Sequence, residues 1–82
     1  MQKYANHGGD SGIEAFRISD DSICLQFMKS GTYTYTLESI GAEHLENMKR
    51  LAIAGEGLNE YLNRNREVYN GWASKGGREL YR

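Results

Sequence analysis

The 82-residue sequence has no proline, a single cysteine, a single tryptophan and only two histidines. Its lone thiol, Cys24, has no partner for an internal disulfide, which favours a reducing compartment and predicts a cytoplasmic protein. No apolar run approaches the roughly 18 residues that are needed to span a bilayer, so we expect no membrane insertion. Residues 1–7 also lack the apolar centre of a signal peptide.

The scarcity of reactive side chains limits the chemistry of this chain. A zinc site needs about four suitably spaced ligands, and Cys24, His7 and His44 are too few and too scattered, so we expect no metal and no cofactor. His44 is interpreted as a solvent-facing helix residue. The neighbouring Asp20 and Asp21 are typical of a polar turn, where water keeps carboxylates from acting as general acids. The sequence therefore predicts no enzyme.

The charge balance does not indicate a dedicated nucleic-acid-binding domain. The net charge is -1, divided between residues 1–44, with three Lys/Arg against six Asp/Glu (-3), and residues 45–82, with seven against five (+2). This basic excess is far weaker than the usual electrostatic footprint of such domains. Clustering on a surface counts for more than the total, so the balance decides neither for nor against nucleic acid.

Three strands are predicted in the first half of the chain. Residues 13–18 suit a short strand, residues 20–21 a turn, and residues 23–28 alternate, with Ile23, Leu25 and Phe27 pointing inward. After a compact loop at residues 29–31, residues 32–37 alternate threonine with Tyr33, Tyr35 and Leu37. Such a three-stranded antiparallel β-meander needs a cover on one face to be stable.

Two helices are predicted to supply that cover. Residues 42–54 repeat apolar positions at helical spacing and end before Gly55, while a shorter helix begins near residue 58 and ends near Asn65. The glycines of Gly55-Glu56-Gly57 are interpreted as a hinge, since no Gly-Lys-Ser/Thr follows them. The prediction is an α+β fold in which the meander is followed by two helices packed on one sheet face.

A single domain is expected, because no repeat or low-complexity segment divides the chain. We predict a flexible N-terminal lead-in over residues 1–11, an ordered domain over residues 12–69 and a loose C-terminal tail over residues 70–82. Within the domain, Tyr33 and Tyr35 either stack on nucleic-acid bases or support the covering helix, and we favour a place in the core or at its rim. Asn59 and Asn63 are interpreted as caps that bond to the backbone.

The order and spacing of these motifs resemble the KTSC domain family, which occurs at the C-terminus of some lysyl-tRNA synthetases and as small stand-alone bacterial proteins. The resemblance covers roughly residues 11–69. It is carried by Ser11-Gly12-Ile13, by Leu25-Gln26-Phe27 with Gly31, Tyr33 and Tyr35, and by Gly57-Leu58-Asn59 with Tyr61, Asn63, Arg66 and Tyr69. The resemblance implies a small α+β fold and a role in nucleic-acid binding, without synthetase activity.

Cations and aromatic residues alternate near the C-terminus and form the candidate binding surface. From Arg64 to Arg82 there are five cations against Glu67 and Glu79, a local charge of +3. Arginine clamps phosphates and aromatic rings stack on unpaired bases, so this pattern favours RNA or single-stranded nucleic acid. The alternative is a protein-interaction or self-association module that docks a partner on a sheet edge or helix face. The predicted contacts are Arg64, Arg66, Tyr69, Trp72, Lys75 and Arg78, although we favour the simpler interpretation that Tyr69 and Trp72 pack back on the domain and that the last residues are a solubilising tail.

Overall fold

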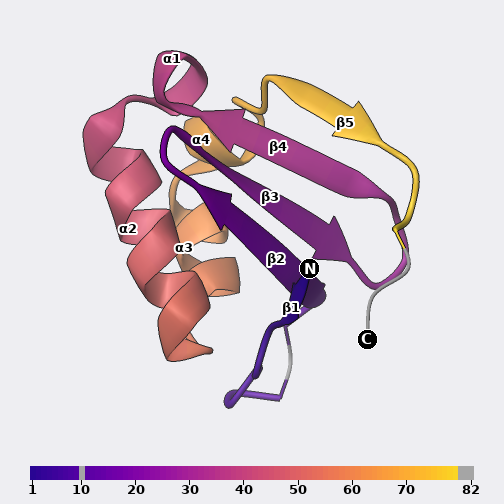
Figure 1. Ribbon diagram of the computed structural model, residues 1–82. Helices are drawn as coiled ribbons and strands as arrows, with labels where there is room; N and C mark the ends of the chain where they lie inside the picture. The colour runs from indigo at the N-terminus through magenta and orange to yellow at the C-terminus, as the bar shows by residue number, and fades with distance from the viewer. Residues whose placement is uncertain (10, 80–82) are drawn as a thin grey trace.

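The computed structural model describes residues 1–9 and 11–79, which form a five-stranded antiparallel sheet and four helices. The strands lie in sequence order across the sheet, as β1 (Gln2–Lys3), β2 (Ile13–Ser19), β3 (Ser22–Phe27), β4 (Thr32–Thr36) and β5 (Ser74–Gly76). Between β4 and β5 the chain forms α1 (Leu37–Ile40), α2 (Ala42–Ala54), α3 (Leu58–Arg64) and α4 (Arg66–Tyr69). Figure 1 shows α2, α3 and α4 on one side of the sheet. The predicted α+β class is confirmed, with two more strands and two more short helices than predicted.

The central meander of β2, β3 and β4 follows the predicted alternation. Ser19 pairs with Ser22, which leaves Asp20 and Asp21 as a two-residue turn between β2 and β3. β3 then pairs with β4 from the Ser22 and Thr36 pair to the Gln26 and Thr32 pair. Because side chains alternate along each strand, this register places Ile23, Leu25, Tyr33 and Tyr35 on the same face.

The core lies between that face and the helices. Ile23 and Leu25 are fully buried together with residues at helical spacing, Leu45 and Met48 from α2 and Leu58 and Leu62 from α3. α2 begins after Gly41 and ends at Gly55, whose φ of 79° is the left-handed conformation that glycine adopts most readily. Both main helices thus occupy the predicted residues, with their apolar faces against the sheet.

The opposite face of β3 is buried as well. Cys24 and Gln26 point away from the helical side, yet they are only 6 % and 0 % exposed. Residues 77–79 provide part of this cover. The Thr32 hydroxyl donates to the Gly77 carbonyl at 3.4 Å, and the backbone N–H of Glu79 donates to Gln26 Oε1 at 2.6 Å. The sheet therefore has a second covered face, which the alternation of residues along the strands does not predict.

The predicted flexible lead-in over residues 1–11 instead joins the fold. β1 pairs with β2, with Gln2 opposite Phe16, and the ring of Tyr4 is 2 % exposed. The backbone N–H of Leu58 donates to the Tyr4 hydroxyl at 3.4 Å. Burial of one such side chain contributes about 2 kcal/mol, which offsets the backbone ordering of only one or two residues of the segment. Residue 10 of this segment lies outside the described residues.

The predicted loose tail over residues 70–82 also joins the fold as far as residue 79. β5 pairs with β4 along Thr32 to Thr34, with Lys75 opposite Tyr33, and so covers part of that edge. The approach is close: a Cβ on Gly31 would lie 1.9 Å from the carbonyl oxygen of Gly76, so only glycine fits at position 31. The domain thus extends beyond the predicted bounds of residues 12–69, and residues 80–82 lie outside the described residues.

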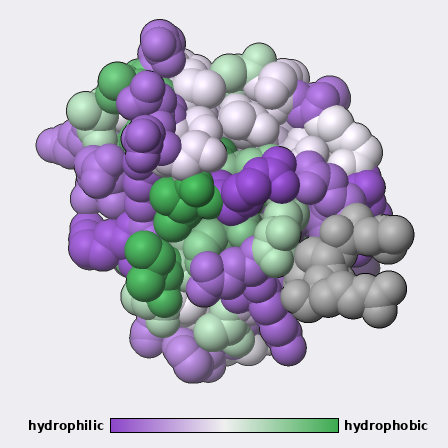
Figure 2. Space-filling model, in the orientation of Figure 1, coloured by the Kyte–Doolittle hydropathy of each residue, from purple (hydrophilic) through white to green (hydrophobic). Residues whose placement is uncertain are grey.

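The outer surface is mainly polar. On the face drawn in Figure 2, hydrophilic residues predominate and hydrophobic residues occupy a limited area. The large hydrophobic side chains that are exposed among the described residues come from separate elements, Met28 before β4, Leu37 in α1 and Ile53 in α2. Over the same residues, no helix has the length and apolar character required to cross a bilayer.

Candidate nucleic-acid interface

Four aromatic rings form one connected cluster where α4 and β5 meet the sheet. The Tyr33 ring lies 5.4 Å from that of Phe27 and 5.7 Å from that of Trp72, with edge-to-face geometry in both pairs. The Tyr69 ring lies 6.1 Å from Phe27. Phe27 is buried, whereas the other three rings are partly exposed. We call Tyr33, Tyr69 and Trp72, with Phe27 beneath them, the aromatic patch.

Two cationic side chains lie against this patch. The Arg66 guanidinium carbon is 5.0 Å from the centre of the Tyr69 ring, and Lys75 Nζ is 5.4 Å from the centre of the Trp72 ring. Both distances are within the range of cation–π attraction. In residues 1–9 and 11–79 neither cation has a carboxylate within ion-pair distance, and both residues are exposed. Among the described residues, the patch therefore combines partly exposed rings with two cations that pair with no carboxylate.

Local structure fixes the position of Tyr69. α4 is a single helical turn that begins after Asn65, whose side-chain amide donates to the Tyr61 carbonyl at 2.8 Å. Val68 is buried and anchors the turn in the core. The hydroxyl of Tyr35 then donates to the Tyr69 carbonyl at 2.8 Å, and burial raises the pKa of Tyr35 above its ordinary value. The ring of Tyr69 is thus carried by a backbone that is tied to the core.

Trp72 and Lys75 are positioned by the sheet. The backbone N–H of Ala73 donates to the Thr34 carbonyl at 2.7 Å and leads the chain into β5. Lys75 then stands opposite Tyr33 in the register, on the same face of the sheet. The interpretation of the strand tyrosines as core or rim agrees with this structure, because Tyr35 is fully buried and Tyr33 belongs to the rim that forms the patch.

Of the six predicted contacts, the structure brings four together, Arg66, Tyr69, Trp72 and Lys75, and separates two. Arg64 pairs with Glu60 at 3.5 Å, and its side chain is 76 % exposed. Arg78 donates to the carbonyls of Phe27 and Met28 at 2.7 and 3.0 Å and pairs with Glu14 at 2.5 Å. Because backbone carbonyls and a carboxylate already hold its guanidinium, Arg78 has a structural role at the end of the sheet.

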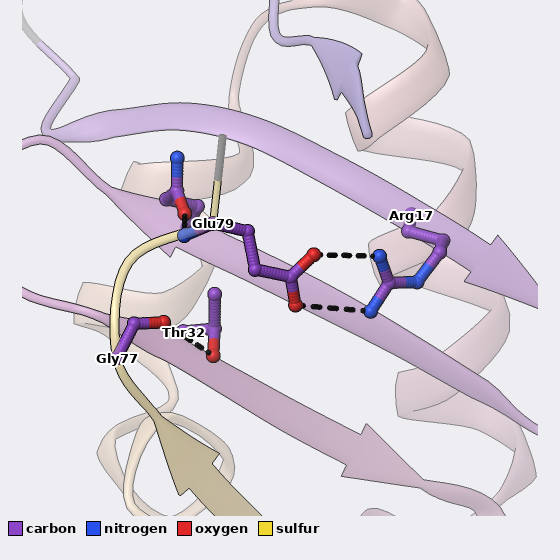
Figure 3. A network of polar contacts seen from close by, with 5 residues as sticks. Arg17, Thr32, Gly77 and Glu79 are labelled. Atoms are coloured by element: carbon purple, nitrogen blue, oxygen red, sulfur yellow. Dashed lines mark hydrogen bonds and ion pairs between the residues drawn. The ribbon is translucent and has the colours of Figure 1, made fainter. Parts of the chain in front are cut away.

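The C-terminal segment carries a second ion pair over the outer sheet face. Figure 3 shows the Glu79 carboxylate reaching both guanidinium nitrogens of Arg17, at 2.9 and 3.2 Å, on the side away from the helices. The hydrogen bonds from Arg17 lower the pKa of Glu79, and the same contact raises the pKa of Arg17. Gln26 lies beneath, and its Nε2 has no hydrogen-bond partner among the described residues. Sequence spacing gave no signal for this contact, since Arg17 and Glu79 are far apart in the chain.

His44 and Cys24 are the remaining candidates for chemistry. His44 is only partly exposed, in contrast to the predicted solvent-facing position, because its Nδ1 lies 2.5 Å from the Tyr61 hydroxyl. Asn47 donates to the same hydroxyl at 3.3 Å, which makes a small polar contact between α2 and α3. Cys24 is a buried strand residue, as its sequence context indicates. In the part of the chain that the structure describes, no three His, Cys, Asp or Glu side chains gather as a metal site would require.

Comparisons with known proteins add no relative to this description. Searches of family models, curated proteins and solved structures found no match to the chain. The candidate interface therefore rests on the residues of the aromatic patch, their cations and their exposure.

Proposed function

We propose that this chain is a small non-catalytic module that binds RNA or single-stranded nucleic acid at the aromatic patch. The observation that carries the proposal is the convergence of three partly exposed rings with Arg66 and Lys75. Unpaired bases stack on aromatic rings with little regard to sequence, at about 1–3 kcal/mol per base, while nearby cations attract the phosphates. The resemblance to the KTSC family, with its implied role in nucleic-acid binding, supports the same proposal.

The expected ligand is flexible rather than a rigid duplex. In a duplex the base faces are already stacked on one another, so the rings of Tyr69 and Trp72 have no access to them, whereas a single strand or loop can offer splayed bases. The two cations are few, so affinity depends on stacking as much as on charge. A cytoplasmic location remains a prediction that is consistent with this class of ligand.

Trp72 provides a direct test, because it is the only tryptophan in the chain. Single-stranded RNA, single-stranded DNA and duplex DNA are titrated into the protein while tryptophan emission is recorded, at about 20 mM and about 150 mM salt. We expect saturable quenching by the two single strands, weaker quenching by the duplex, and a loss of affinity at the higher salt. Binding without any change in Trp72 emission would contradict the proposed place of contact.

A matched pair of double variants locates the surface. Arg66→Ala/Lys75→Ala removes the cations at the patch, and Arg50→Ala/Arg64→Ala removes the same charge from exposed positions in α2 and α3. In fluorescence anisotropy with labelled RNA we expect about tenfold weaker binding for the first double variant. We expect a much smaller change for the second, because salt screens the attraction between the RNA and exposed charges that do not contact it. Equal losses of RNA affinity in the two double variants would indicate that the protein attracts nucleic acid by its overall charge and not at the patch. A failure of all three nucleic acids to bind at low salt would favour the protein-interaction alternative.

A further inference from the structure

A polar hollow lies between the N-terminal segment and the start of α3, among residues that the proposed nucleic-acid site does not use. Its volume is about 440 Å³. Tyr4 and Asn6 line one side, and Gly57, Asn59 and Asn63 line the other. A space of this size accommodates a few atoms of main chain and one long side chain.

Hydrogen bonds within the protein hold the walls of the hollow in place. The backbone N–H of His7 donates to the Gly55 carbonyl at 2.8 Å, and the Tyr4 hydroxyl accepts from Leu58 N–H. Asn6 holds the left-handed φ of 56°, and its Oδ1 accepts from the Ser11 N–H at 3.2 Å. Since these contacts close the segment onto the glycine hinge, the shape of the hollow exists before any ligand enters it.

Two carboxamides at the rim have no structural task within the described residues. Asn59 and Asn63 lie one helical turn apart on α3 and therefore on the same helix face. The predicted role as caps is not realised, because Gly57 is the N-cap of α3 without a side-chain bond and Asn65 ends the helix. Asparagine is also a poor helix former, so two of them in a seven-residue helix cost stability that no side-chain contact of theirs within the described residues offsets.

The ionisable groups give the hollow a negative balance. Glu56 and Glu60 face one cation, Arg64, which leaves a formal charge of -1 among the lining residues. Arg64 is only loosely paired with Glu60, at 3.5 Å, on an exposed helix surface. A phosphate-bearing nucleotide meets net repulsion here, whereas an ammonium or guanidinium group meets attraction.

We propose that this hollow binds a lysine- or arginine-bearing peptide segment of a partner protein. The carboxamides of Asn59 and Asn63 each offer a donor and an acceptor, which match the alternating N–H and C=O groups of an extended main chain. Glu56 and Glu60 receive the cationic side chain at the rim. This site is separate from the aromatic patch in its residues and in the sign of its charge, so it stands whether or not the chain binds nucleic acid.

The test uses the full chain, labelled with ¹⁵N, and short blocked peptides. A glycine peptide with one central lysine is compared with the arginine, glutamine and glutamate versions, by the chemical shifts of the Asn59 and Asn63 side-chain amides. We expect saturable shifts with lysine and arginine, smaller shifts with glutamine and none with glutamate. Absence of shifts at millimolar lysine peptide, or equal shifts with glutamate, would overturn the proposal. Shifts caused by adenosine monophosphate and not by the lysine peptide would overturn it in favour of a nucleotide site.

Variants separate main-chain recognition from charge recognition. We expect Asn59→Ala and Asn63→Ala to weaken binding of both lysine and glutamine peptides by about 3- to 10-fold each, as the loss of a hydrogen bond predicts. Glu56→Gln/Glu60→Gln should abolish the preference for lysine over glutamine while binding persists. Asn70→Ala, an exposed asparagine outside the lining, is the matched control and should bind as the unaltered chain does. Equal effects of Asn70→Ala and Asn63→Ala on affinity would contradict the proposed site.

Discussion

At the scale of single residues, Gly55 joins backbone conformation to long-range packing. Its φ of 79° ends α2, and a Cβ at this position would lie 2.6 Å from the Cβ of Ala5. Two separate costs therefore oppose a side chain here: a left-handed backbone, and a collision with the N-terminal segment. The second cost exists only because residues 1–9 pack on the hinge.

A matched pair of glycine substitutions distinguishes these costs. Gly55→Ala should destabilise the fold by about 2–4 kcal/mol, since strain and overpacking add. Gly9→Ala has nearly the same φ, 80°, but a Cβ there meets nothing within 4 Å, so only the backbone cost of about 1–2 kcal/mol is expected. Urea unfolding followed by circular dichroism measures both. Equal losses would show that the contact of Ala5 with the hinge has no energetic weight.

At the scale of elements, the segment after β5 is held over the outer sheet face by the Arg17 and Glu79 pair. Arg17 lowers the pKa of the Glu79 carboxyl relative to the unfolded chain. A lowered folded-state pKa contributes stability above the unfolded value, and this contribution disappears as the pH falls through the folded value. The contact is exposed on both sides, so its effect is modest and sensitive to salt.

The pH dependence of Glu79→Gln tests this linkage. The free energy of unfolding of the variant should fall below that of the unaltered chain above roughly pH 5, and the two should converge towards pH 3 as the carboxylates become protonated. Urea titrations at several pH values measure the difference. Glu46→Gln, which removes one partner of a longer pair at 3.5 Å to Lys49, is the control and should show a smaller change. A Glu79→Gln difference that does not depend on pH would contradict the ion-pair account.

At the scale of the whole molecule, the sheet combines local and distant pairing. β2, β3 and β4 pair with their neighbours in sequence, whereas β5 reaches β4 only after four helices have intervened. β5 is three residues long, and all of them are exposed. Short exposed pairings open at a lower free energy than a buried central strand does.

Hydrogen exchange should reveal this difference in strength. We expect amides in the β4 and β5 pairing, such as that of Ala73, to exchange at least about tenfold faster than those of Ile23 and Leu25 in β3. Native-state exchange followed by NMR gives the rates residue by residue. Equal protection in the two regions would mean that β5 separates only when the whole domain unfolds.

The same division between local and distant contacts explains what the sequence could predict. Strands with period-two alternation and helices with marked ends, such as the one ending at Gly55, follow from neighbouring residues. β1 and β5 are too short to carry a pattern, and α4 is a single turn. At the candidate site the alternation of cations and rings indicated Arg66, Tyr69, Trp72 and Lys75, but the carbonyls that hold Arg78 belong to residues 27 and 28, which lie 51 and 50 positions earlier in the chain. No local rule could separate Arg78 from the cations at the patch.

The late position of β5 in the chain also has a consequence in time. The outer edge of β4, with its sequence Thr-Tyr-Thr-Tyr-Thr, pairs with a segment that lies roughly forty residues later in the chain, so this pairing must close a long loop and forms more slowly than the central hairpins. Until that loop closes, an edge rich in strand-forming residues is open to pairing with a second chain. Docking of β5 covers part of that edge, so a short and exposed strand limits misassembly during folding.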